Sequence, residues 1–184
     1  LLASGQMNID DIIEMKNQLS MFDYMLDIAK EPLTEEIIKE FHKILKTNTS
    51  DEKKDWFNVG EYKKLANTVG GKDTTNPEDV AEEMKKLLQK YNEKKDVKIE
   101  DIIQFHFEFE RIHPFQDGNG RVGRMIMFKE CLKHSIIPFI IQNDIKQYYY
   151  RGLSEFENEK GFLIDTCLSA QDKYKEMVEK FLGK

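Results

Sequence analysis

Cysteine, long apolar runs and excess positive charge are all scarce in this chain of 184 residues. The two cysteines, Cys131 and Cys167, lie among apolar neighbours in segments that read as helix, where a free thiol behaves as a small hydrophobic group. This pattern favours reduced thiols and a cytoplasmic protein. The opening Leu-Leu-Ala-Ser-Gly has no positively charged lead of the signal-peptide kind, which supports the same expectation.

The missing apolar runs and the charge balance exclude two further classes of protein. The longest strongly apolar stretch, residues 136–141, is far shorter than the roughly 20 residues that span a bilayer. The net charge is -6, and Lys and Arg are mixed with Asp and Glu, so no basic stripe is available for a phosphate backbone. We therefore expect neither a membrane nor a nucleic acid as partner. With 40% hydrophobic residues, the chain can form one core.

Helical periodicity predicts a mostly helical domain. Apolar residues recur at helical spacing from about residue 10 to residue 28. A second helix is predicted to start after Thr34, which can cap it, and to end in the polar cluster 47–50. A third is predicted with Asn76 as its cap and Pro77 at the first helical position, where a missing N–H costs nothing.

Two further segments frame the chemistry. The glycine-punctuated residues 58–71 are the only credible β element and predict a short hairpin or an extended loop. Residues 99–112 are apolar on nearly all sides, as expected of a helix at the centre of a domain, and Pro114 breaks that helix. The next helix is predicted to begin around Gly120 or Arg121. A polar loop therefore joins two buried helices.

The loop between these helices offers a binding site for anions. Gly118 and Gly120 allow the backbone to approach a ligand closely, and they lie where the N–H groups of a helix start are exposed. Arg121 and Arg124 are three residues apart, so both can reach phosphate groups from the first turn. Cations at a helix N-terminus oppose its dipole, which favours an anion bound there.

Three other side chains of the loop suit catalysis on a bound phosphate. Asp117 provides a hard oxygen ligand of the kind that Mg²⁺ prefers. Asn119 can donate to a phosphoryl oxygen without adding charge. His113 is the one side chain of the set that can accept a proton near neutral pH, so it is the natural general base for a hydroxyl.

The string from His113 to Arg124, His-Pro-Phe-Gln-Asp-Gly-Asn-Gly-Arg-Val-Gly-Arg, resembles the Fic-family signature at every fixed position. The resemblance implies an all-α Fic fold, a helical bundle around two central helices with a short β-hairpin flap. It also implies ATP as donor, Mg²⁺ as cofactor, and transfer of AMP to a Tyr, Thr or Ser hydroxyl of a target protein, including the enzyme itself.

By the same resemblance, each residue of the loop has a role. His113 deprotonates the acceptor hydroxyl and Asp117 holds Mg²⁺. Residues 118–120 bind the α- and β-phosphates, while Arg121 and Arg124 hold the phosphate tail.

The likeness extends to two more distant segments. Residues 60–63 and 67–71 resemble the family's flap, which aligns the target by strand-like pairing. Many relatives carry Arg where this chain has Lys63. The two-pronged hydrogen bonding of an arginine side chain is therefore not expected of Lys63. Residues 149–153 resemble the helix that lines the adenine pocket. The nucleotide-contacting residues implied in these segments are Asn67, Thr68, Val69, Gly70, Tyr149, Tyr150 and Asn158.

We expect one Fic domain over residues 1–184, with a core of about 30–165 and a truncated or degenerate inhibitory segment at its N-terminus. Many Fic proteins carry a helix whose Glu pairs with the second arginine of the motif. The only remnant here is Ala3-Ser4-Gly5, which puts Ser4 where the Glu belongs. The hypothesis is that no such clamp acts on Arg124.

Alternatives remain open at this stage. His106, among three phenylalanines, is expected to be a core histidine. The Fic fold also serves phosphate transfer in its Doc-like branch, whose loop departs from Gly-Asn-Gly at Gly118 and Gly120, and phosphocholine transfer elsewhere. A non-catalytic, nucleotide-dependent binding module of a toxin–antitoxin pair is the alternative outside enzymes. The oligomeric state stays open, with a homo-oligomer among the options.

Overall fold

The structure is a computed structural model and describes residues 8–183. Within this range, helices alternate with loops and with one two-stranded antiparallel hairpin. The elements are α1 (Ile9–Asp27), α2 (Glu35–Lys46), the 3₁₀ turn η1 (Ser50–Lys53), β1 (Thr68–Val69), β2 (Lys72–Asp73), α3 (Val80–Asn92), α4 (Ile99–Ile112), α5 (Asn119–Lys133), α6 (Lys146–Glu155) and α7 (Gly161–Phe181). The predicted fold class, all-α with a short hairpin, is confirmed.

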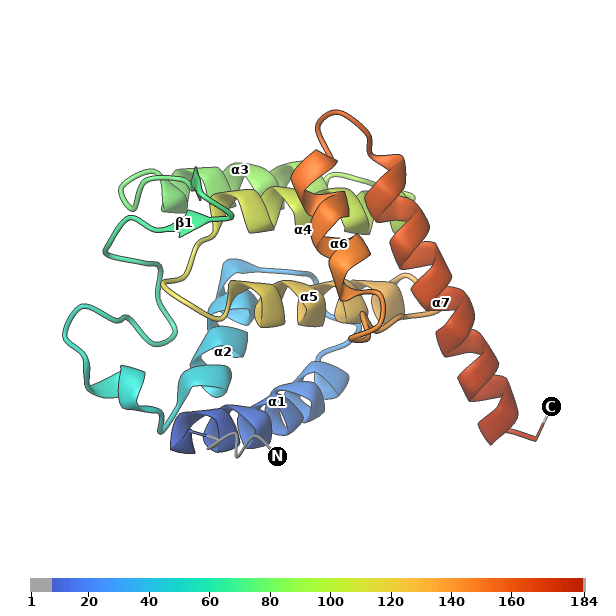
Figure 1. Ribbon diagram of the computed structural model, residues 1–184, viewed down its shortest axis with the longest axis horizontal. Coiled ribbons are helices and arrows are strands. Elements are labelled where there is room, and N and C mark those ends of the chain that lie inside the picture. The colour runs from blue at the N-terminus through green and yellow to red at the C-terminus, as the bar shows by residue number, and fades with distance from the viewer. Residues whose placement is uncertain (1–7, 184) are drawn as a thin grey trace, which may run out of the picture.

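The helices α4 and α5 form the centre of the molecule (Figure 1). α3 packs on α4, α2 and α1 pack on α5, and α6 and α7 pack on each other beside the central pair. The loop that joins α4 to α5 emerges at one end of the pair, on the side where the hairpin and the long segment after α2 also lie (Figure 1). Both central helices are largely buried, so their side chains anchor this loop in the core.

Local sequence explains where α2 begins but not where α3 begins. Thr34 caps α2, because its Oγ1 accepts a hydrogen bond from the N–H of Ile37 at 3.4 Å. The predicted start of α3 at Pro77 was wrong, since this helix begins at Val80. Asn76 does not cap it, because its carbonyl accepts from the N–H of Asp79 at 2.9 Å and closes a separate turn first.

None of the helices within residues 8–183 combines the length with the apolar character that crossing a membrane requires. The two cysteines lie in helices, as expected, and both are buried free thiols.

Close packing of α6 on α7 depends on Gly152. A Cβ atom at this position would lie 2.7 Å from the Cα and 2.8 Å from the backbone N of Leu163. Because backbone atoms cannot move aside, Gly152→Ala is expected to destabilise the fold by about 1–3 kcal/mol. Thermal unfolding measures this, with Ser154→Ala on the exposed side of α6 as the control. Equal melting temperatures for the two variants would show that the helices do not meet this closely.

Candidate active site

The loop after α4 starts at His113, which is the C-cap of that helix. His113 has φ 52° and ψ 61°, a left-handed conformation that non-glycine residues rarely adopt. Its N–H still donates to the carbonyl of Phe109 at 2.9 Å, and Pro114 follows. The helix therefore ends at His113, and the chain turns sharply there into the loop. Unusual backbone conformations of this kind concentrate at functional sites.

Asn119 braces the loop from inside. Its Oδ1 accepts from the N–H of Phe115 at 2.8 Å, and its Nδ2 donates to the carbonyl of the same residue at 2.8 Å. The side chain is buried, so both ends of the amide are engaged within the loop. This arrangement fixes the loop's shape and leaves the backbone N–H of Asn119 as its group toward a ligand.

His42, which the sequence did not single out, supports the loop from α2. Its ring stacks on Phe115 with centroids 4.0 Å apart and planes 6° from parallel. Its Nδ1 accepts from the N–H of Gly60 at 3.0 Å, and its Nε2 lies 3.1 Å from the carbonyl oxygen of Asp117. Burial lowers the pKa of His42 to about 4, so the ring is neutral at pH 7. His42 thus ties the loop to α2 without adding charge.

The first turn of α5, at the other end of the loop from His113, presents unsatisfied N–H groups. Gly118 precedes the helix with φ 84°, and a Cβ atom there would come within 3.0 Å of Leu45. The backbone N–H groups of Gly118, Asn119 and Gly120 find no acceptor among residues 8–183. Such a helix start binds anions through its N–H groups and its dipole.

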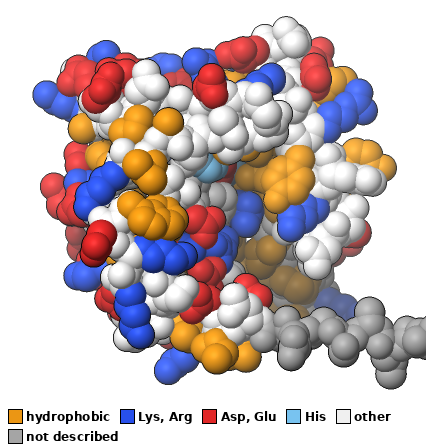
Figure 2. Space-filling view, turned by 60° about the vertical axis from the view of Figure 1, so that its left-hand side comes forward, with side chains coloured by type: hydrophobic (Ala, Val, Ile, Leu, Met, Phe, Trp, Pro, Cys, Tyr) orange, Lys and Arg blue, Asp and Glu red, His pale blue; other side chains and the backbone are white. Residues whose placement is uncertain are grey.

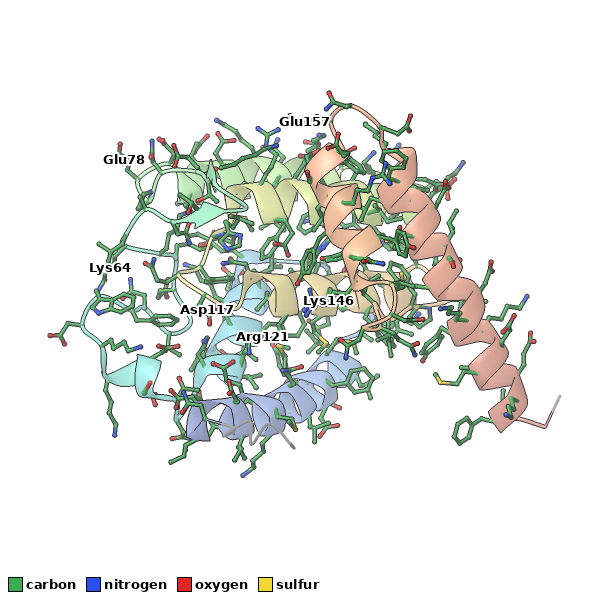
Figure 3. The ribbon with its side chains drawn as sticks, in the orientation of Figure 1. Lys64, Glu78, Asp117, Arg121, Lys146 and Glu157 are labelled. Carbon is green, nitrogen blue, oxygen red and sulfur yellow. The ribbon has the colours of Figure 1, made fainter. Side chains whose placement is uncertain are left out.

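The motif arginine nearest this turn already has carboxylate partners. Arg121 contacts Glu14 of α1, and its other terminal nitrogen lies 3.3 Å from Oδ2 of Asp117. Asp117 and Arg121 lie close together at the start of α5 (Figure 3). The sequence argument treated a bound anion as the only compensation for a cation here. Glu14 and Asp117 provide part of that compensation within the protein.

A buried ammonium group joins these charges together. Lys46, at the end of α2, is 1% exposed and lies between Glu14 at 2.7 Å, Asp51 at 2.8 Å and Asp117. Three carboxylate oxygens of these residues lie within 4.8 Å of one another, a spacing that could hold a metal ion. In the structure the ammonium of Lys46 supplies the positive charge instead.

Asp117 nevertheless fits its predicted role as a metal ligand. Both of its side-chain contacts, to Lys46 and to Arg121, use Oδ2. Its Oδ1 has no hydrogen-bond partner within the described part of the chain, and 57% of the side chain is exposed. One free carboxylate oxygen next to the free N–H groups of a helix start matches the way Mg²⁺ is commonly held together with substrate phosphates.

His113 is a neutral imidazole at pH 7. Burial lowers its pKa to about 4, and the nearby Lys63 adds to this, while a hydrogen bond with the carbonyl of Glu110 opposes it. That bond joins Nδ1 of His113 to the Glu110 oxygen at 3.3 Å. With Nδ1 as the protonated nitrogen, Nε2 carries the lone pair that can accept a proton.

The flap is fastened to the loop by Lys63 and Asn67. The N–H of Lys63 donates to the carbonyl of Pro114 at 2.8 Å, and its Nζ donates to Asn67 at 2.8 Å and to Thr74 at 2.7 Å. Asn67 in turn donates to the carbonyl of Phe115 at 3.1 Å. Nζ also donates to the carbonyl of Ile112 at 3.4 Å, so Lys63 anchors the hairpin through four acceptors, without the fork of an arginine.

Beyond this anchor, the hairpin is open to solvent. Of the four residues of the flap that were predicted to contact the nucleotide, Asn67 is half-buried, and Thr68, Val69 and Gly70 are exposed. This face of the molecule is hollowed, and a histidine side chain is visible within the hollow (Figure 2). The flap residues are therefore available to a ligand or a peptide.

The three residues predicted to line the adenine pocket differ in how exposed they are. Tyr149 is buried, and its hydroxyl lies 2.5 Å from Nε2 of the buried His106. Its ring lies below the guanidinium of Arg124, 5.9 Å away, so it supports that arginine from inside. Tyr150 is 51% exposed, and Asn158 is exposed in the turn between α6 and α7. Of the three, Tyr150 and Asn158 are open to a nucleotide.

A cavity of about 200 Å³ adjoins both arginines of the motif, between α1, α5 and residues 139–141. A larger cavity of about 480 Å³ lies between α3, α4 and the turn after α6, and it contains none of the residues of the His113–Arg124 loop. Size therefore does not identify the site. The cluster of charged and hydrogen-bonding groups at the loop does.

Fold and site together define a helical protein whose two central helices are joined by a short loop, with a histidine at its start and free N–H groups at its end. The chain belongs to the Fic/DOC family, whose sequence profile matches residues 32–131. A probable protein adenylyltransferase of Aquifex aeolicus is 38% identical over 66 residues, which cover 36% of this chain and 20% of that protein. The protein adenylyltransferase fic-1 of Caenorhabditis elegans is 28% identical over 88 residues, which cover 46% of this chain and 17% of that protein.

Solved structures confirm the Fic fold. A Fic domain containing signaling protein from Bacteroides thetaiotaomicron matches with a TM-score of 0.79 at 24% identity, over 93% of this chain and 72% of that one. The BepC protein of Bartonella tribocorum, solved with bound AMPPNP, matches with a TM-score of 0.63 at 16% identity. The match covers 87% of this chain and 86% of that one. The chain spans about a fifth of the length of the curated relatives it matches.

The segment that the sequence suggested as an inhibitory remnant, Ala3-Ser4-Gly5, lies outside the described residues. Glu14 and Lys46 were not predicted as parts of the site. A signal existed for both, because Glu14 is one heptad before the buried Met21, and Lys46 is one turn after the buried His42. A charged residue on the apolar face of a helix indicates a buried partner.

Proposed function

We propose that the chain is a protein adenylyltransferase, which transfers AMP from ATP to a Tyr, Thr or Ser hydroxyl of a target protein, itself included. The observation that carries this proposal is that one short loop has His113 at its start and the free N–H groups of residues 118–120 at its end. A proton acceptor next to an anion site is what attack of a hydroxyl on a phosphate requires. The adenylyltransferase names of the curated relatives support the choice of AMP.

The reaction follows from these groups. The hydroxyl oxygen attacks the α-phosphorus in line, forming one O–P bond while the bond to the β-phosphate breaks and pyrophosphate leaves. His113 accepts the hydroxyl proton at Nε2. The N–H groups of residues 118–120, with Arg121 and Arg124, hold the phosphates and stabilise the charge that develops on them. Magnesium held by Asp117 supplies neutralisation of phosphate charge when bound.

The flap supplies the position of the target. Thr68 and Val69 form a short exposed strand, and an extended peptide can add to such an edge through backbone hydrogen bonds. Because Lys63 and Asn67 tie this strand to the loop, a peptide bound there lies at a fixed distance from His113. Positioning of this kind contributes a large share of catalysis between two bound reactants.

Two labelled substrates test the proposal. The protein is incubated with Mg²⁺ and ATP labelled either on the α- or on the γ-phosphate, and protein-bound label is counted. AMP transfer retains the α-label and loses the γ-label with pyrophosphate. Incorporation of the γ-label would instead indicate phosphate transfer, and a protein that binds ATP without incorporating either label would be a binding module.

A further inference from the structure

Glu110 is a charged side chain that the mechanism above does not use, although it lies among the residues that carry it. It occupies α4 one turn before His113, and only 14% of its side chain is exposed. Its Oε2 lies 3.8 Å from Nδ1 of His113, and its Oε1 lies 3.9 Å from Nε2 of His106. That Oε1 has no hydrogen-bond partner among residues 8–183. A buried carboxylate oxygen without a partner is costly and needs an explanation.

The surroundings of Glu110 are built to accommodate it. A Cβ atom on Gly123 would come within 3.0 Å of its Oε1 and within 2.8 Å of the His106 ring, so the glycine leaves the room that both side chains occupy. A Cβ atom on Gly120 of α5 would lie 3.1 Å from a guanidinium nitrogen of Arg124 and 3.7 Å from Oε1 of Glu110, so these two groups are close to each other. The carboxylate therefore lies between the histidine and the second arginine of the motif.

Four other titratable groups affect Glu110 and His113, one from α4 itself and three from other parts of the chain. Tyr149 of α6 has its ring 5.9 Å from the guanidinium of Arg124, and burial together with the charge of Glu110 raises the pKa of its hydroxyl. His106 belongs to α4 itself and is kept neutral by burial, which lowers its pKa to about 3. The charges of Lys63, from the segment before the flap, and of Asp117, from the loop, also affect the pKa of His113, the first lowering it and the second raising it. Of these groups, only Glu110 offers an anion to Nδ1 of His113 from within the core.

We infer that Glu110 is the positioning residue of His113. The Glu110 carbonyl accepts the Nδ1–H, and the carboxylate 3.8 Å away places its negative charge on the same side of the ring. Nε2 is thereby kept as the nitrogen that faces the incoming hydroxyl, and the imidazolium formed when His113 takes the proton is stabilised. Where it concerns catalysis, this inference rests on the proposed function. An opposite charge within about 4–6 Å favours the charged form of a titratable group by about 1–3 pKa units.

The ionisation of Glu110 gives this role a pH dependence. Burial raises the pKa of Glu110 to about 7, with the charge of Arg124 opposing the rise. Below that pH the carboxyl is neutral and offers His113 no charge, and above it the carboxylate is present. The contribution of Glu110 to catalysis therefore grows as pH rises through 7.

The kinetic test compares Glu110→Gln with Glu108→Gln, a carboxylate on the same helix that pairs with Lys90 at 2.7 Å. Near pH 5.5 the turnover of Glu110→Gln should equal that of the unchanged protein, because both carry a neutral group. Near pH 8.5 it should be about tenfold lower, with the KM for ATP unchanged. Glu108→Gln should follow the unchanged protein throughout. A loss of equal size at every pH, or none at pH 8.5, would overturn the inference.

An NMR titration tests the same pair without activity. In the unchanged protein, the side-chain carbon of Glu110 and the ring nitrogens of His113 should shift together near pH 7. In Glu110→Gln the His113 step should disappear, and in Glu108→Gln it should remain. Independent titrations overturn the inference even if AMP transfer is observed. If Glu110 and His113 titrate together but the protein transfers no AMP, the proposed function is refuted, and the positioning of His113 by Glu110 is still supported.

Discussion

Replacing His113 with Ala is expected to lower the rate of AMP transfer by about 10²- to 10⁴-fold, the range that a general base contributes. The affinity for ATP should change little, because we propose that the N–H groups of residues 118–120 and the two arginines, not His113, hold the phosphates. Turnover is measured with α-labelled ATP, and affinity by calorimetric titration of the protein with a non-hydrolysable ATP analogue.

The control for this variant is His134→Ala, which removes a histidine from the opposite end of α5. It should retain the transfer rate of the unchanged protein, since His134 is not part of the loop. Undiminished labelling in His113→Ala would remove this residue from the mechanism. A loss of ATP binding together with activity would show that the imidazole holds the nucleotide and is not the base.

Replacing Lys46 with Met is expected to destabilise the fold by about 3 kcal/mol, the effect of removing one partner from a buried ion pair. Lys46 is 1% exposed and compensates Glu14 and Asp51, which are themselves largely buried. For a chain of this length, the loss corresponds to a melting temperature lower by about 6–12 °C. The exposed Lys43 on the same helix, paired with Glu40 at 3.4 Å, gives the control variant Lys43→Met.

The pH dependence of this stability has a definite sign. Burial alone would raise the pKa of Asp51, but its bonds to Lys46 and Lys54 outweigh this, and the pKa is lowered. A carboxyl with a lowered pKa stabilises the fold above its unfolded pKa of about 3.9, and this is lost as pH falls through the folded value. The difference in melting temperature between Lys46→Met and the unchanged protein should therefore become smaller at acidic pH. An equal melting temperature for both at pH 7 would show that Lys46 is not needed there.

Much of the fold could be predicted because the helix-breaking residues lie where the helical periodicity of the apolar residues ends. Pro114 and the glycines around Asn119 separate two apolar runs, and α4 and α5 end and begin there as expected. The buried state of His106 was also predicted correctly from its aromatic neighbours. Periodicity does not reveal which apolar face is covered. In α1, Met25 is buried while Leu19 is 69% exposed, although both fit the same helical pattern.

The loop of the site could be located from the sequence, but its electrostatic partners could not. Glu14 reaches Lys46 and Arg121 only because α1 packs on α2 and α5, a contact between residues far apart in the chain. Neighbouring tyrosines present the same difficulty. Tyr149 and Tyr150 are adjacent in a helix, where successive side chains point in different directions, so one is buried and the other exposed.

A crystal structure of the protein with Mg²⁺ and a non-hydrolysable ATP analogue tests the central claim most directly. The account predicts the phosphates on the N–H groups of residues 118–120 and the metal on Asp117. The α-phosphorus should lie within about 6 Å of Nε2 of His113, close enough for a hydroxyl to reach both. Phosphates bound instead in the larger cavity between α3, α4 and the turn after α6, away from His113, would contradict it.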